Sequence, residues 1–203
     1  MHISEGFLSP QALAVGWAAA GLGVAAGLKK MDPERTVRVA VMSSAFFLAS
    51  LVNVRIGPAS THLALIAPLG LILGWASFPA VMVALLLQAL FFQFGGLAVL
   101  GVNTLDMALP ALAVYLCFAR AVRTGGPLAS GLAAFAAGFS AILLGAALLS
   151  LFLAASDPGM MGAARVAFAA HLPLALIEGV FTLFFAAFLR RVAPDLLGGV
   201  ERG

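Results

Sequence analysis

The sequence predicts an all-α integral membrane protein with about seven transmembrane helices, its N-terminus outside and its C-terminus in the cytoplasm. Three observations predict this class: the apolar composition, the length of the apolar runs and the distribution of basic residues. About 63% of the residues are hydrophobic and 9% are charged, whereas soluble domains average about 45–50% apolar and about 25% charged. Because a soluble chain of 203 residues cannot bury so much apolar surface, we expect a bilayer to cover it.

Apolar runs close to the length that a helix needs to cross a bilayer recur along the chain. They lie at residues 10–28, 37–54, 61–77, 78–95, 104–119, 127–154 and 167–189. The run at 61–77 is the weakest candidate, because it is short and contains Pro68. No internal repeat or linker separates the runs. We therefore expect one domain over residues 1–203, in which residues 1–9 form a short N-terminal segment.

The basic residues indicate the orientation of the helices. If the N-terminus is outside, the segments between the runs alternate between the two sides of the membrane, and most Lys and Arg fall on the cytoplasmic side. The cytoplasmic segments hold Lys29, Lys30, Arg35, Arg38, Arg120, Arg123, Arg190, Arg191 and Arg202, and the outer segments hold Arg55 and Arg165. This bias agrees with an odd number of spans.

The chain opens MHISEGFL, with no Lys or Arg before residue 29. A cleavable signal peptide begins with a basic region, so we expect these residues to remain in the mature protein. Methionine removal requires a small second residue, and His2 is large, so Met1 is expected to keep an unblocked amine. In the predicted topology all three histidines, His2, His62 and His171, fall on the outer side.

An unblocked Met1 followed by His2 can chelate a metal ion. The terminal amine, the His2 backbone nitrogen and the imidazole Nδ1 close a five-membered and a six-membered ring around one ion. A second imidazole would complete a square-planar set of four nitrogens, the geometry that Ni(II) and Cu(II) favour. Because these ligands lose protons on binding, affinity is expected to fall with pH. The alternative is that His2 is an incidental exposed residue.

His62 is the candidate for the second imidazole. It stands in IGPASTHLAL, where the Gly57-Pro58 pair interrupts the backbone just before a predicted span. Ionisable groups at membrane depth are costly and often functional, so His62 is either a ligand or a hydrogen-bonded interfacial residue. Its neighbours Ser60 and Thr61 are candidates for orienting the ring.

Four further polar residues stand in or near apolar runs, each with two interpretations. Asn103 and Asp106 either hydrogen-bond the N-terminal segment or cap a helix. His171 either supports the ligands or packs at the interface. Glu178 either makes a structural hydrogen bond to a neighbouring helix or has a functional role.

Four motifs in order, MHISEGFLS, GPASTHL, QALFFQFGGLAVLGVNTLDMALPA and HLPLALIEG, resemble the nickel/cobalt substrate-capture subunits (S components) of energy-coupling factor ABC transporters. The resemblance spans nearly the whole chain and is closer to the nickel type than to the cobalt type. Two departures stand out: Ser4 replaces a common proline, and Asp106 stands where nickel-type members are expected to carry asparagine.

The resemblance implies a seven-helix subunit that binds Ni(II) through the Met1 amine, the His2 backbone nitrogen, the His2 imidazole and His62. A loop over Gly95–Asn103 would cover the site. The alternative substrate is Co(II) supplying cobalamin biosynthesis.

The implied partners are a transmembrane coupling (T) subunit, two ATP-binding cassette ATPases and a small accessory membrane subunit, in the bacterial cytoplasmic membrane. Because this chain has no Gly-rich phosphate loop, we expect it not to be an enzyme and ATP to be hydrolysed by those separate subunits. Apart from the transported ion, no cofactor and no nucleic acid is expected.

Two other classes are weaker alternatives. An intramembrane metalloenzyme would use His2, His62 and His171 around Zn(II), but the sequence has no HExxH motif. An ion channel or proton-coupled carrier would place charged residues deep in several spans, and only Glu178 and Asp106 qualify.

Overall fold

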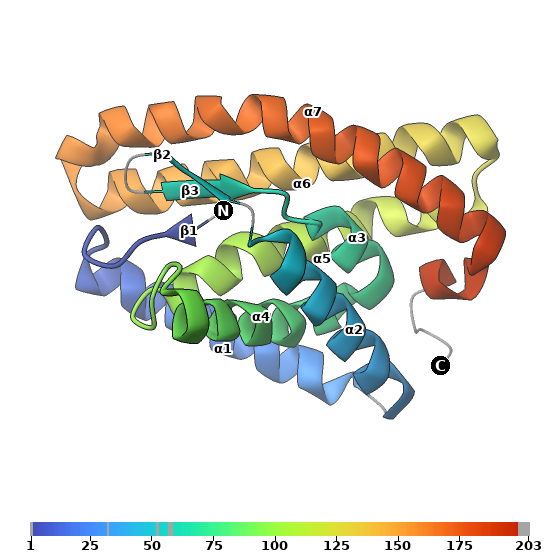
Figure 1. Ribbon diagram of the computed structural model, residues 1–203, viewed down its shortest axis with the longest axis horizontal. Helices are drawn as coiled ribbons and strands as arrows, with labels where there is room; N and C mark the ends of the chain where they lie inside the picture. The colour runs from blue at the N-terminus through green and yellow to red at the C-terminus, as the bar shows by residue number, and fades with distance from the viewer. Residues whose placement is uncertain (1, 32, 52, 57–58, 199–203) are drawn as a thin grey trace.

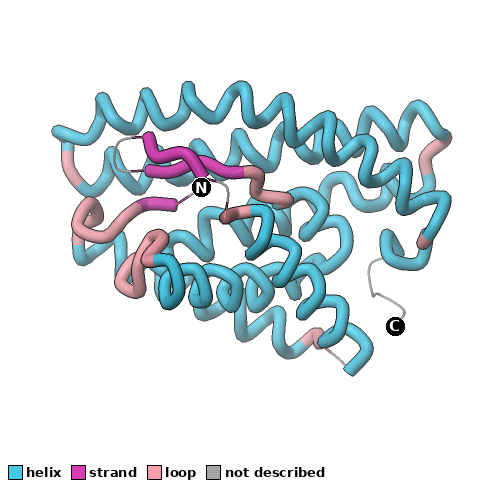
Figure 2. The backbone as a smooth tube through the Cα atoms, in the orientation of Figure 1, coloured by secondary structure: helices cyan, strands magenta, loops and turns pink. Residues whose placement is uncertain are grey.

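The computed structural model describes residues 2–31, 33–51, 53–56 and 59–198, with the side chains of 33–35, 53–56, 59–61 and 198 outside this description. The architecture is mostly helical, with a small sheet near one end (Figures 1 and 2). The helices are α1 (Pro10–Lys29), α2 (Pro33–Ala49), α3 (Ile66–Leu73), α4 (Ser77–Phe92), α5 (Leu100–Thr124), α6 (Pro127–Ser156) and α7 (Met161–Val192). The strands are β1 (His2–Ile3), β2 (Asn53–Ile56) and β3 (Ala59–His62), and 3-10 turns cover Gly74–Ala76, Pro158–Met160 and Pro194–Gly198.

Within the described residues, five helical stretches are long and apolar enough to cross a membrane. They are Pro10–Lys29, Ile66–Phe92, Leu100–Thr124, Pro127–Ser156 and Pro158–Val192, and Thr36–Ala49 is a shorter apolar helix. The chain is therefore a multi-pass membrane protein, but a count of seven spans is not confirmed. The run at 61–77 is not one uninterrupted helix, because it holds the end of β3, the eight-residue α3 and a 3-10 turn. Gly74 enters that turn with φ of +54°, a conformation that favours glycine.

The expectation of an all-α chain is wrong at one place. The three strands form an antiparallel sheet in the order β1-β3-β2. His2 pairs with Ser60 and Ile3 with Ala59, while β2 pairs with β3 from Asn53 opposite His62 to Ile56 opposite Ala59. The apolar residues of this stretch predicted the ends of two transmembrane spans. The turn-forming Gly57-Pro58 pair, which lies outside the described residues, instead separates two segments that are short enough to form a hairpin.

Small residues bring the helix backbones close together. In α1, a Cβ at Gly16 would lie only 2.9 Å from Val102 Cα of α5. In α3, a Cβ at Gly70 would overlap the Ala111 carbonyl of α5. Membrane helices commonly associate through such small residues, because lipid supplies no hydrophobic force between them. The backbones of α1 and α3 thus approach α5 closely at these two glycines.

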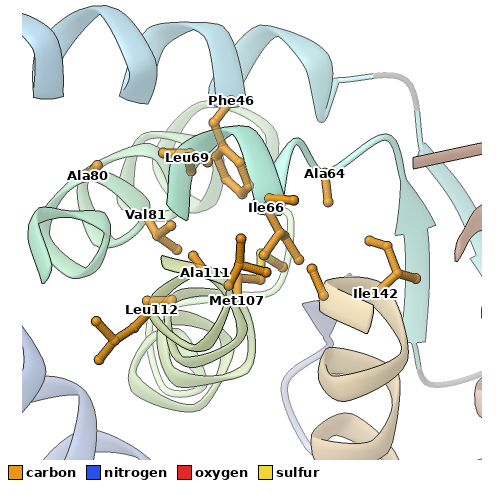
Figure 3. Close-up of a cluster of buried hydrophobic side chains, with 14 of the residues drawn as sticks. Phe46, Ala64, Ile66, Leu69, Ala80, Val81, Met107, Ala111, Leu112 and Ile142 are labelled. Atoms are coloured by element: carbon orange, nitrogen blue, oxygen red, sulfur yellow. The ribbon is translucent and has the colours of Figure 1, made fainter. Parts of the chain in front are cut away.

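The apolar core lies where α3, α4, α5 and α6 meet. Figure 3 shows Phe46 of α2, Ile66 and Leu69 of α3 and Met107 of α5 within this cluster, and all four side chains are buried. The basic C-terminal ends of α1, α5 and α7 lie at the end of the molecule away from the sheet (Figure 1). Arg190 donates a hydrogen bond to the Gly125 carbonyl at that end, over 2.8 Å.

Candidate metal centre

The sheet brings two histidines together that are far apart in the sequence. Because β1 pairs with β3, His2 and His62 lie next to each other at one end of that strand pair. Their imidazole centroids are 4.9 Å apart, with the ring planes inclined by 41°. His2 is 2% exposed and His62 is 4% exposed, so the incidental, exposed alternative for His2 is wrong. The Phe46 ring meets the His62 ring edge-on, with centroids 6.2 Å apart.

Asn103 of α5 holds β1 in place from the other side. Its Oδ1 accepts a hydrogen bond from the Ile3 backbone N–H over 2.8 Å, and its Nδ2 donates to the Ile3 carbonyl over 3.1 Å. One amide side chain therefore satisfies both polar groups of a buried backbone residue. Of the two interpretations of Asn103, contact with the N-terminal segment is confirmed. The cap interpretation is wrong, because the N-cap of α5 is Val99.

The loop between α4 and α5 lies over β1. Glu5 donates its backbone N–H to the Gly95 carbonyl over 3.1 Å and accepts from the Ala98 backbone N–H through Oε1 over 2.8 Å. Gly95 has φ of +73°, and a Cβ there would lie 2.9 Å from Asn103 Nδ2 and 3.6 Å from His2 Cδ2. Glycine thus permits both the backbone conformation and the close approach to the histidine.

A chain of polar groups leads from His2 into the bundle. His2 Nε2 lies 2.7 Å from Gln88 Oε1 of α4, Gln88 Nε2 lies 2.5 Å from Ser50 Oγ, and Ser50 Oγ donates to the Phe47 carbonyl over 2.7 Å. Gln88 and Ser50 are both fully buried. Sequence reasoning missed these two residues. The available signal was an amide inside the apolar run VALLLQALFF, since a buried amide needs hydrogen-bond partners.

Burial also acts on the charge of the two imidazoles. Removal from solvent lowers the pKa of His2 and the pKa of His62 well below the usual histidine value, because a buried ring disfavours the charged form. Both rings are therefore neutral at neutral pH, the form in which imidazole binds metals. The His62 Nδ1 lies 3.0 Å from the Leu63 carbonyl. Since a carbonyl only accepts, this nitrogen carries the proton and Nε2 carries the lone pair.

The other predicted residues are placed less directly. Met1 lies outside the described residues, and so do the side chains of Ser60 and Thr61, whose backbone forms part of β3. Asp106 is fully buried in α5, and its carboxylate has no hydrogen bond to the described part of the N-terminal segment. His171 is buried in α7, and its Nδ1 lies 2.7 Å from the Ala167 carbonyl one turn earlier.

Glu178 of α7 makes the structural hydrogen bonds that were one of its two alternatives. Its Oε1 accepts from the backbone N–H groups of Ala64, over 2.5 Å, and Leu65, over 3.0 Å. Leu65 is the N-cap of α3, with φ of +49°, and has no side-chain capping bond of its own. The carboxyl group thus anchors the segment that leads from His62 into α3, so its contact is with this junction rather than with a neighbouring helix.

These features define a multi-pass membrane protein with a buried pair of neutral histidines, one of them in a short N-terminal strand. The model of the family described as the cobalt uptake substrate-specific transmembrane region matches residues 2–196. The chain belongs to this family, and it is a transmembrane component of nickel or cobalt transport.

Individual relatives agree with this assignment. A Haemophilus influenzae protein named for metal transport is 35% identical, covering 99% of this chain and 98% of that protein. The fused nickel transport protein NikMN of Rhodobacter capsulatus is 34% identical over 97% of this chain and 64% of its own length. A crystal structure of a transition metal transporter has a TM-score of 0.77 and 28% identity, covering 95% of this chain and 93% of that chain. The names include both cobalt and nickel, so the choice of metal stays a prediction.

Proposed function

We propose that this chain is the substrate-capture subunit of an energy-coupling factor transporter and binds Ni(II) in a square-planar site of four nitrogens. The donors are the Met1 amine, the His2 backbone nitrogen, His2 Nδ1 and His62 Nε2. Co(II) supplying cobalamin biosynthesis is the alternative substrate. The observation that carries the proposal is the 4.9 Å separation of the His2 and His62 ring centroids in a buried position.

The state of each ring fits this donor set. His62 directs Nδ1 to the Leu63 carbonyl, which leaves the Nε2 lone pair for a metal. His2 contacts Gln88 through Nε2, and Nδ1 is the ring nitrogen that can close a six-membered chelate with the His2 backbone nitrogen. The two rings therefore present opposite nitrogens, as a chelating and a simple imidazole ligand require.

Nickel is preferred over cobalt on chemical grounds. A deprotonated backbone nitrogen together with imidazole and amine donors gives a strong planar field, which suits Ni(II) and Cu(II). The oxygen-rich or tetrahedral sets that suit other divalent ions would need different side chains. The NikMN relative is named for nickel, which agrees with this preference, whereas the family is named for cobalt.

The remaining parts of the proposal concern the assembly. Residues 1–203 act as one transmembrane domain of seven spans, with residues 1–9 outside and the C-terminus in the cytoplasm of a bacterial cell. The separation of the sheet from the basic helix ends supports this orientation. A T subunit, two ATPases and a small accessory membrane protein complete the transporter and supply ATP hydrolysis.

Fusion of a histidine-free tag to the N-terminus tests the site directly. The tag converts the Met1 amine into a peptide nitrogen, so the five-membered chelate ring loses its amine donor, and nickel binding by the purified protein, measured by calorimetry, is expected to be lost. The same tag at the C-terminus, with the Met1 amine unblocked, serves as the control and is expected to leave binding unchanged. Nickel binding of undiminished affinity by the N-terminally tagged form would refute the proposed donor set.

His62→Ala tests the fourth donor separately. The variant retains the Met1-His2 chelate, so it is expected to bind nickel more weakly, with an altered visible spectrum, rather than to lose it outright. An unchanged spectrum would remove His62 from the site. Uptake of radioactive nickel and cobalt by cells that carry all partner subunits then decides between the two substrates.

A further inference from the structure

We propose that Gln88 is a positioning residue that fixes the tautomer of His2, and that Ser50 fixes the orientation of Gln88. This inference rests on the proposed function, because it explains how His2 keeps Nδ1 ready for a metal. The three residues come from β1, from α4 and from the turn directly after α2. They form a continuous hydrogen-bonded chain that ends on the Phe47 carbonyl.

The end of the chain determines its direction. A backbone carbonyl has lone pairs but no hydrogen, so Ser50 must donate its hydroxyl hydrogen to Phe47 over the observed 2.7 Å. Ser50 Oγ then has only lone pairs to offer to Gln88, 2.5 Å away. The amide NH₂ of Gln88 must therefore face Ser50, and its carbonyl oxygen must face His2.

The same logic continues to the imidazole. Gln88 Oε1 only accepts, so His2 Nε2, 2.7 Å away, carries the hydrogen. A neutral imidazole has one N–H, and the Nδ1 of His2 consequently carries the lone pair. The reverse direction, with Gln88 turned over, would put two lone pairs against each other between Ser50 and Phe47. Only one direction supplies a hydrogen to all three contacts.

The burial of the chain gives this direction its strength. His2, Gln88 and Ser50 are at most 2% exposed, so an unmatched contact would leave a polar group without a partner, which is costly in a dry interior. Outer hydrogen-bond partners of metal-binding histidines commonly fix the tautomer in this way, and their loss typically reduces metal affinity about 10- to 100-fold. The polar chain thus holds His2 in the chelating tautomer before the metal arrives.

The protein has three histidines, so the tautomer of each can be measured directly. Correlation spectra of ¹⁵N-histidine-labelled, metal-free protein at neutral pH are expected to show His2 protonated on Nε2. His62 and His171 face the Leu63 and Ala167 carbonyls through Nδ1, so both are expected to be protonated on Nδ1. Single His→Gln variants assign the signals. A His2 signal with the hydrogen on Nδ1 in the unaltered protein would overturn the inference without any mutation.

Gln88→Leu and Ser50→Ala then test the two steps of the chain. Both variants are expected to give mixed His2 tautomers. Nickel affinity is expected to fall about 10- to 100-fold in Gln88→Leu and by a smaller factor in Ser50→Ala. Matched controls are Gln11→Leu, at an exposed position of α1, and Ser44→Ala, which removes a serine–carbonyl bond within α2. Both controls are expected to leave the tautomer and the affinity unchanged.

A pure Nε2–H signal for His2 in Gln88→Leu would overturn the role of Gln88, whatever the effect on affinity. A merely structural residue would alter stability without altering the tautomer. Because the tautomer is measured without metal, it stands or falls apart from nickel binding by the unaltered chain, which tests the proposed function itself.

Discussion

The sheet end and the helix bundle of this protein are held together by different means. In the bundle, contacts such as Gly16 against Val102 and Gly70 against Ala111 depend on the absence of a side chain. At the sheet end, β1 is held by directional bonds from Asn103 and from the loop after α4. Close packing of membrane helices requires small residues at the contacts, whereas a site for an ion requires specific hydrogen-bond partners.

Glu178 connects the two regions, and its removal is expected to have the largest effect. Glu178→Leu leaves the buried Ala64 and Leu65 N–H groups without their acceptor, at a cost of about 1–3 kcal/mol for each unsatisfied group. Thermal unfolding in detergent is expected to occur at a markedly lower temperature, and nickel binding is expected to weaken because these residues adjoin His62. Glu178→Gln, whose amide oxygen still accepts both bonds, is the matched variant. Equal losses in the two variants would argue against the anchoring role.

Gly70→Ala tests the bundle alone. The added Cβ would overlap the Ala111 carbonyl, so α3 and α5 must separate, and overpacking of this kind costs about 1–3 kcal/mol. Gly131→Ala in α6 is the control, since nothing lies within 4 Å of a Cβ there, and it is expected to be neutral or slightly stabilising. If both variants unfold at the same temperature as the unaltered protein, close backbone packing of α3 on α5 is not important for stability.

Asn103→Leu tests the sheet end alone, with the smallest expected effect on global stability. Both hydrogen bonds to Ile3 are lost, but β1 is a two-residue strand that can separate locally and be solvated. Hydrogen exchange of the Ile3 amide is therefore expected to accelerate about 5- to 150-fold, the equivalent of about 1–3 kcal/mol, while the unfolding temperature changes little. Unaltered exchange at Ile3 would show that Asn103 does not hold the strand.

The contrast also explains what the sequence could predict. The runs that became α1, α5, α6 and α7 were recognisable because length and apolarity alone define a long membrane helix. The sheet was missed because its strands are only two to four residues long, and because β1 pairs with β3 across more than 50 positions, from Ile3 to Ala59. Asn103 was singled out because it is polar. The sequence alone left two alternatives open for it, a hydrogen bond to the N-terminal segment or a helix cap.

Gln88 and Ser50 illustrate the remaining limit. Each is unremarkable in its own segment, and their proposed function depends on a third residue, His2, from the N-terminal strand. Local patterns specify elements, whereas a hydrogen-bonded chain through three elements is a property of the tertiary structure.

The electronic state of nickel bound to the unaltered protein tests the central claim most directly. Visible absorption and X-ray absorption of the nickel-loaded protein are expected to show a diamagnetic, four-coordinate ion with nitrogen donors only, as a planar set from Met1, His2 and His62 requires. A paramagnetic, six-coordinate ion with oxygen donors would contradict the account.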